Sequence, residues 1–408
     1  MNAVIQAHRD EIKRIAGECR GMLLDRVAPF WASRVVDEAF GGYFTCFDHQ
    51  GRLYDTRKPG WFLGRTMYTF SSLCQRFGNR PEWLDVAKAG YDFLPKAEVG
   101  EGRFAQMLSR DGTILTGAAS IFTDHFAVKG AVNYLFVLGK QAPGAEIERV
   151  KAWLDRLLLH VKNPDVLCGE CPDERFQKHA VNFMTLTVLI EARKLFGDEY
   201  SAILRENVYR SLYQFACDAL QAPLEYIGRD GAPLSVGPGR LVDAGHTMES
   251  LWFSMEAADQ LGEESWYARA EQVLDWVIEK CWDADFGGFV QHVDFERGKP
   301  DDAYRITDYD GTPVAWDEKI WWVQAEGLIA LCMSALRNGN ESHWRRFTEL
   351  YEYVKRHFVD AATGEWVSFL RRDGTILSGC LGSMLKGPYH VPRCLMMLSR
   401  ALEEAADA

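Results

Sequence analysis

The sequence lacks the features that would point to nucleic acid or to a membrane. Its 46 lysines and arginines are outnumbered by 58 aspartates and glutamates, which leaves a net charge of −12, and no basic cluster interrupts this balance. Nucleic acid is therefore not an expected partner. No apolar run reaches the length of a membrane span, and the stretch from Met1 to Arg20 has no apolar signal segment. We therefore expect no membrane partner.

The sequence also lacks a cysteine framework. Its ten cysteines are scattered, and the closest pair, Cys168 and Cys171, has no second CxxC and no histidine pair at zinc spacing. This pattern predicts free thiols in a reducing compartment and a cytoplasmic protein. A P-loop, a GxGxxG after a strand, an HExxH and a GxSxG are absent as well. The sequence therefore predicts no cofactor and no metal.

What the sequence does have is long stretches of helical periodicity, within a composition that is 47% hydrophobic and 25% charged. Pro29 is a candidate interruption of the first helix. We expect helices at 2–36, 61–78, 81–94, 120–139, 145–161, 178–196, 199–220, 247–261, 264–282, 317–337, 341–358 and 391–404.

Short turn-rich pieces separate these helices, and some of them repeat. RDGTIL occurs at 110–115 and again at 372–377, RDGAPL stands at 229–234, and the GGYF at 41–44 is echoed by GGFV at 287–290. We expect hairpins at 40–51, 103–117, 224–234, 286–290 and 366–379. Echoes between long helices indicate a repeated helical-hairpin unit. The sequence predicts an all-α fold, an (α/α)6 barrel with short β-hairpins in its connecting loops and a single catalytic domain over 1–408; an open α-solenoid is the alternative.

The stretch 243–253 holds the first candidate catalytic group. His246 and Glu249 are three residues apart and share a face of the predicted helix. Gly245 permits a tight turn and Thr247 is a plausible N-cap, which places His246 at the positive end of a helix. A histidine kept neutral there is a usable general base. The alternative is a capped helix start with a structural histidine; a metal site would need more ligands than this pair.

Two more stretches have similar chemistry. His390 also stands just before a predicted helix, with Pro392 in its first turn, so a barrel would bring His246 and His390 to one mouth as a neutral pair. In WWVQAE, Trp322 and Glu326 are i, i+4 neighbours, and the indoles of Trp321 and Trp322 beside a carboxylate suit a sugar. Asp317 is the expected cap of that helix.

Arg65 lies within an apolar and aromatic helix, where a guanidinium needs either an ion-pair partner or a cavity to line. The structural alternative is a salt bridge to a carboxylate at a helix end. Asp124, His125 and His179 stand at other helix starts, and we interpret them as capping or structural residues.

Taken together, these stretches resemble one family, the N-acylglucosamine 2-epimerase superfamily, which also includes cellobiose 2-epimerases and mannose and sulfoquinovose isomerases. The resemblance spans nearly the whole chain in family order. It implies an (α/α)6 barrel and metal-free proton transfer at C2 of a sugar, with His246 and His390 as the catalytic pair. It also implies that Arg65, Glu249 and Glu326 contact the substrate. The matching pieces are GGYFTCFD at 41–48, GR at 64–65, GHTMESLWF at 245–253, WWVQAE at 321–326 and KGPYHVPR at 386–393.

Three departures separate branches of the family. The segment 186–192 lacks the histidine of cellobiose epimerases and mannose isomerases, as N-acylglucosamine epimerases do, whereas WWVQAE with Gln324 looks more like the isomerase branch. Leu385 stands where an aromatic is common. We predict a 2-epimerase of an aldose such as N-acetylglucosamine or N-acetylmannosamine, with an aldose–ketose isomerase as the alternative. A small sugar is the expected substrate and a homodimer a candidate assembly.

Two other classes of function remain open at this stage. The family includes a mammalian renin-binding protein, but a pure binding module would not need both histidines and Arg65. A glycoside hydrolase would need two carboxylates at a defined separation, for which Glu249 and Glu326 are the candidates.

Overall fold

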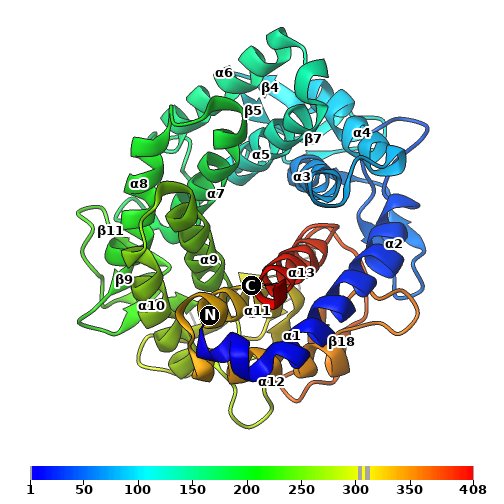
Figure 1. Cartoon of the computed structure of the whole chain (residues 1–408). Helices are drawn as coiled ribbons and strands as arrows, with labels where there is room; N and C mark the ends of the chain where they lie inside the picture. The colour runs from blue at the N-terminus through cyan, green and yellow to red at the C-terminus, as the bar shows by residue number, and fades with distance from the viewer. Residues whose placement is uncertain (1, 302–305, 308–312, 408) are drawn as a thin grey trace.

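The computed structural model describes residues 2–301, 306–307 and 313–407, and these residues are largely helical. Six helices line the central space of a ring, and each packs against the next along the chain (Figure 1). These inner helices are almost continuously buried, which fits their apolar composition. They are α3 (Gly60–Phe77), α5 (Ile121–Leu138), α7 (His179–Phe196), α9 (Ala244–Leu261), α11 (Trp321–Asn338) and α13 (His390–Asp407).

A second layer of helices lies outside this ring (Figure 1). Each outer helix buries one face against an inner helix and exposes the other, as expected for an amphipathic sequence. An outer helix returns the chain between successive inner helices, so the inner helices run in the same direction and begin at one end of the ring. The outer helices are α1 (Ala3–Met22), α4 (Pro81–Ala97), α6 (Gly144–His160), α8 (Ser201–Tyr209), α10 (Ser265–Cys281) and α12 (Glu341–His357).

Short antiparallel strands occupy the connections. Sheets form from β1 with β2, β4 with β5, β3–β6–β7, β8 with β11, β9 with β10, β12 with β13, β14 with β15, and β16–β17–β18. Their bounds are β1 Cys46–Phe47, β2 Leu53–Asp55, β3 Lys58–Pro59, β4 Glu98–Gly100, β5 Arg103–Phe104, β6 Met107–Leu108, β7 Ile114–Thr116, β8 Phe176–Lys178, β9 Ala216–Cys217, β10 Ala222–Pro223, β11 Tyr226–Gly228, β12 Leu241–Asp243, β13 His292–Asp294, β14 Ile306–Thr307, β15 Pro313–Val314, β16 Lys319–Ile320, β17 Phe369–Leu370 and β18 Ile376–Ser378.

The repeated RDGTIL turns have the same environment in the structure. In the first copy, buried Lys58 donates to the carboxylate of Asp37 at 3.0 Å and to the main-chain oxygen of Arg110, whose guanidinium also binds Asp37. A shared arrangement of buried charges supports the interpretation of the echoes as an internal repeat. The second copy makes the same contacts with Lys319, Asp283 and Arg372.

Several predicted bounds were wrong for identifiable reasons. The helix expected at 2–36 breaks into α1, a π-helical turn at Leu23–Val27 and α2 (Ala28–Ala32), because Pro29 cannot donate a main-chain hydrogen bond. The helix expected at 199–220 ends as a π-helical turn at Arg210–Gln214, after which β9 pairs with β10. Short 3₁₀ turns at Gly139–Gln141 and Gly237–Arg240 complete the helical elements of the described residues.

The hairpins at 103–117 and 366–379 are confirmed by the pairs β6–β7 and β17–β18. The predictions at 40–51 and 224–234 were wrong in pairing, and the turn at 286–290 has one antiparallel bridge instead of a strand pair. The first hairpin runs from β1 to β2, over 46–55, instead of 40–51. The strand β11 within 224–234 pairs with the distant β8. At 286–290, Phe289 forms a single antiparallel bridge with Trp282, and the side-chain amide of Gln324 binds the N–H and the C=O of Phe289 at 2.9 and 2.8 Å.

Within the described residues, no helix combines the length and apolar character that crossing a bilayer requires.

Candidate active site

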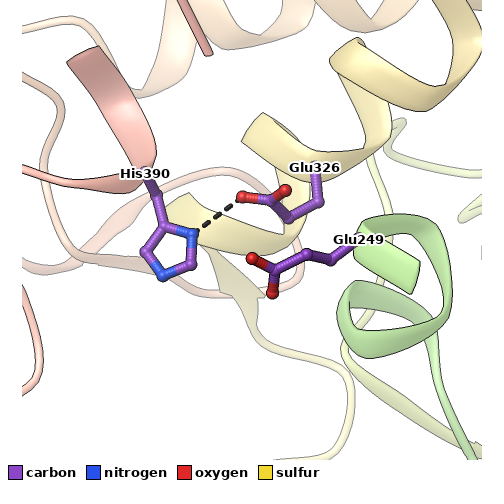
Figure 2. A group of neighbouring side chains, drawn as sticks. All are labelled: Glu249, Glu326 and His390. Carbon is purple, nitrogen blue, oxygen red and sulfur yellow. Dashed lines mark hydrogen bonds and ion pairs between the residues drawn. The ribbon is translucent and has the colours of Figure 1, made fainter. Parts of the chain in front are cut away.

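A cavity of about 300 Å³ opens where the inner helices begin. All but one of the predicted site residues line it, and Glu326 lies directly behind His390 (Figure 2). The remaining walls are mostly apolar. The lining residues are Trp61, Arg65, Phe122, Phe126, Lys178, Ala180, Phe183, Met184, His246, Glu249, Gln291, Ile320, Trp321, Trp322, Phe369, Leu385 and His390.

The start of α9 differs from the prediction. The helix begins at Ala244, and Asp243 is its N-cap, with its carboxylate accepting from the main-chain N–H of His246 at 2.9 Å. Thr247 is therefore not the cap; its hydroxyl donates to the carbonyl of Asp243. A Cβ atom at Gly245 would overlap the ring of Trp322, so glycine here lets the indole lie directly against α9.

His246 carries a proton, contrary to the prediction of a neutral ring. Its Nδ1 lies 3.1 Å from the carboxylate of Glu225 and 3.3 Å from that of Asp243. Burial alone would lower the pKa of His246, but the charges of Asp243 and Glu225 raise it to about 9. The helix-end argument failed because two full negative charges within 3.3 Å outweigh the partial charge of a helix terminus.

His390 has the opposite state. Its Nδ1 lies 2.7 Å from Oε1 of Glu326 (Figure 2). A carboxylate accepts only, so Nδ1 holds the hydrogen and Nε2 presents a lone pair. Burial, with the positive charges of Arg393 and Arg65, lowers the pKa of His390 well below its usual value. At neutral pH this ring is a neutral base.

Arg393 holds the two carboxylates of the site together. Its guanidinium donates to Glu249 at 2.6 Å, to Glu326 at 2.7 Å and to the hydroxyl of Tyr389 at 2.6 Å, and the side chain is fully buried. Arg393 stands in the KGPYHVPR motif, where the sequence pattern assigns it no role. The i, i+3 spacing from His390 on α13 was the available signal.

Glu249, Glu326 and His390 offer atoms within 4.8 Å of one another, a spacing that metal ligands can have. The positive charge of Arg393 already compensates both carboxylates. A divalent cation placed among them would have to lie beside a buried guanidinium, which electrostatics opposes.

Arg65 has no carboxylate within 4.0 Å among the described residues, so the predicted alternative of a helix-end salt bridge was wrong. Its guanidinium lies over aromatic rings instead, 4.2 Å from the centre of Phe126 and 5.0 Å from that of Tyr389. Burial lowers the pKa of Arg65 to about 10, so the group stays charged at neutral pH. Its Nε is buried without a hydrogen-bond partner. A Cβ at Gly64 would overlap the main chain of Phe126, so this glycine lets α3 approach α5 closely.

Trp322 connects the two histidines. Its ring centre lies 5.4 Å from that of His246 and 5.6 Å from that of His390. Trp321 is buried against Phe369 and contributes to the cavity wall. The helix α11 starts at Trp321 without a side-chain cap, because residues 319–320 pair as β16; the predicted cap at Asp317 was wrong.

Asp124, His125 and His179 lie outside the cavity and are structural in the environments seen here. Asp124 pairs with Arg103, while His125 binds the hydroxyl of Thr185 at 3.0 Å, and burial lowers its pKa to about 4. Burial lowers the pKa of His179 to about 3. The sequence reasoning missed Glu225 and Lys178, and the proximity of Glu225 to His246 depends on tertiary structure alone.

The comparisons with known proteins agree with this architecture. The fold is similar to a solved cellobiose 2-epimerase from Bacillus thermoamylovorans, with a TM-score of 0.78 at 16% identity over 95% of this chain and 100% of that one. A D-mannose isomerase structure gives a TM-score of 0.75 at 16% identity, over 96% and 97% of the two chains.

Sequence comparison is more specific. The family pattern of N-acylglucosamine 2-epimerase (GlcNAc 2-epimerase) matches residues 42–394. The N-acylglucosamine 2-epimerase of Bos taurus is 30% identical over 93% of this chain and 89% of its own length. A cellobiose 2-epimerase of Bacteroides fragilis is 25% identical over 95% and 99%. The chain belongs to the N-acylglucosamine 2-epimerase family.

Proposed function

We propose that this chain is a sugar 2-epimerase, an isomerase, built as one (α/α)6-barrel catalytic domain over 1–408. Three features support the barrel. The helices form two layers, the six inner helices run in the same direction, and the same Lys–Asp–Arg contacts, here called the clamp, occur at both RDGTIL turns. The inner helices begin around one cavity, so groups far apart in sequence meet there. The preferred substrate class is an aldose such as N-acetylglucosamine or N-acetylmannosamine, the names that relatives carry.

One observation carries the proposal: His246 and His390 face one cavity, both next to Trp322, in environments that shift their pKa values in opposite directions. Epimerisation at C2 needs a base on one face of the carbon and an acid on the other. The neutral imidazole of His390 and the protonated imidazole of His246, which line the same cavity of about 300 Å³, provide that base and that acid.

The mechanism follows from the two states. With the sugar in its open-chain form, Nε2 of His390 takes the proton from C2 and becomes a cation. The electron pair of the broken C–H bond delocalises onto the C1 carbonyl oxygen. Nε2 of His246 then donates its proton to the opposite face of C2, and the carbonyl reforms. His390 releases its proton to water and His246 takes one up, which restores the starting state.

The developing oxyanion needs stabilisation, because a C–H bond next to an aldehyde is a weak acid. Arg65 is the group we assign to it: a charged guanidinium at the cavity wall, without a carboxylate partner among the described residues. The N-termini of the inner helices add positive potential at the same end of the ring. Glu249 lines the cavity and is available to a sugar hydroxyl, and Trp322 offers a flat face to the sugar carbons.

The glycosidase alternative is less well supported. Glycoside hydrolysis needs one carboxyl group that holds a proton for the leaving oxygen. Glu326 accepts hydrogen bonds from Arg393, His390 and the indole of Trp252. Its oxygens already serve as acceptors, so it is not available to protonate a leaving oxygen.

Incubation with N-acetylmannosamine and, separately, with mannose in heavy water tests the proposal by NMR. Deuterium at C2 of the recovered epimer, without ketose, is the expected result for an epimerase. Ketose formation would show the aldose–ketose isomerase alternative, and release of sugar from a glycoside would show a hydrolase. The absence of C2 exchange across a panel of GlcNAc, ManNAc, glucose, mannose, lyxose and cellobiose would refute the proposal.

A further inference from the structure

Glu225 is a buried carboxylate with an unusual environment. It lies between β10 and β11, is 3% exposed, and neither of its carboxylate oxygens accepts a hydrogen bond within the described part of the chain. Its main chain is fixed on both sides, since its N–H donates to the carbonyl of Leu241 at 2.9 Å and its carbonyl accepts from His179 at 2.8 Å. The backbone therefore holds the carboxylate in place without help from its own oxygens.

Such a group is costly, because a buried carboxylate normally has several hydrogen bonds or a close ion pair. The close cation here is His246, whose Nδ1 lies 3.1 Å from Oε2. A feature that costs stability and contacts one site residue suggests a functional role.

Asp243 also raises the pKa of His246, but unlike Glu225 it has other partners. Both carboxylate oxygens of Asp243 have other partners. Oδ1 accepts the main-chain N–H of His246 as the helix cap, and Oδ2 lies 2.8 Å from Nε2 of His292. Lys178, across the cavity wall, opposes the positive charge on His246. His179 lies nearby, but burial keeps its pKa far below neutrality. Phe183 and Trp322 complete the surroundings with uncharged rings.

We propose that Glu225 is a positioning residue: its charge, 3.1 Å from Nδ1, holds the protonated His246 ring with Nδ1 on the side of the carboxylate and Nε2 on the side of the cavity, although Nδ1 makes no regular hydrogen bond to it in this structure. The kinetic consequence rests on the proposed function, whereas the orientation of the ring does not. As the cation, His246 can give up its Nε2 proton. Once neutral, it keeps the hydrogen on Nδ1, so that Nε2 has a lone pair ready to take the next proton from water. Without Glu225 the hydrogen can settle on Nε2, and the ring is then the wrong tautomer for the reverse step.

Glu225→Gln tests this, because the amide has the same shape and removes the charge. We expect NMR titration of histidine-labelled protein to show the pKa of His246 falling by at least one unit. The neutral ring should shift from the Nδ1–H to the Nε2–H tautomer. Turnover should drop by roughly 10²–10⁴, the range for a misplaced acid–base group, with KM changed less than about threefold.

Asp283→Asn is the matched control. It neutralises another buried carboxylate, which binds Lys319 and Arg372 beside the second RDGTIL turn and is not among the residues that line the cavity. It should lower the melting temperature and leave both the His246 titration and the pH profile of kcat/KM unchanged. A purely structural role for Glu225 would give the same pattern as this control.

An unchanged pKa and tautomer of His246 in Glu225→Gln would overturn the proposal, whatever the sugar. If that variant does not fold, the same NMR titration is made on the wild-type protein. A neutral His246 ring with its hydrogen on Nε2 would then contradict the role given to Glu225. If instead the titration shifts as expected but the wild type exchanges no C2 hydrogen with any sugar, the proposed function fails and the positioning role stands.

Discussion

Replacing Arg393 by methionine is the sharpest test of how the site is held together. The guanidinium is fully buried and binds two carboxylates and a tyrosine hydroxyl. Methionine keeps the length and the apolar stem but removes the charge. Glu249 and Glu326 would then be close together without a cation between them, and one of them must take up a proton.

The size of the effect can be worked out. Breaking a buried ion pair by removing one partner costs about 3–5 kcal/mol of unfolding free energy. An unfolding entropy of about 2.1 cal/mol/K per residue gives roughly 0.9 kcal/mol/K for 408 residues. The melting temperature should therefore fall by about 3–6 °C. Activity should fall roughly 10²-fold or more, because a proton on Glu326 or on Glu249 disturbs the hydrogen bond that holds His390 as the base and the carboxylate that faces the sugar.

Calorimetry and C2 deuterium exchange measure the two effects. Arg400→Met is the matched control: it makes the same substitution two turns later on α13, where the arginine is 39% exposed and pairs with Glu256 at 3.3 Å. A partly exposed pair costs less to break than a fully buried one, so this variant should melt closer to wild type than Arg393→Met does. If Arg393→Met melted as close to wild type as this control, the two carboxylates could not be charged and buried as described, and the reasoning would be refuted.

The remaining predictions concern the histidines and the indole between them. The rate kcat/KM should rise with pH through the low pKa of His390 and fall as pH passes about 9, where His246 loses its proton; a profile that keeps rising above pH 9 contradicts this. Because the folded pKa of His246 is raised, its contribution to stability is complete below pH 6.5 and disappears as pH rises through about 9, which urea unfolding at a series of pH values would detect. His246→Asn and His390→Asn should each lower turnover by roughly 10²–10⁴, with circular dichroism unchanged; wild-type rates would remove either residue from the mechanism. Gly245→Ala should displace Trp322 and raise KM for the sugar, whereas unchanged kinetics would show that the indole does not contact substrate.

The helical periodicity and the motifs predicted much of this protein. The inner helices follow apolar patterns that are buried on nearly all sides, and the echo of RDGTIL marks two equivalent turns because each closes the same Lys–Asp–Arg clamp. The predicted site residues also came from local signals: a histidine at a helix start, a carboxylate three residues on, an indole beside a glutamate. Bounds were wrong where the main chain departs from a regular helix, as at the π-helical turns Leu23–Val27 and Arg210–Gln214.

The sequence by itself determined which groups the site has and which helix each stands on, because periodicity and helix starts are local properties. Tertiary structure decided much of the charge on each group. The pKa of His246 is raised by Asp243, three residues earlier, together with Glu225 from a different segment, and the pKa of His390 is lowered by burial and by Arg393 and Arg65, which face it within the ring of helices. Proton affinity depends on charges within a few ångströms in space, and those neighbours come from segments far apart along the chain.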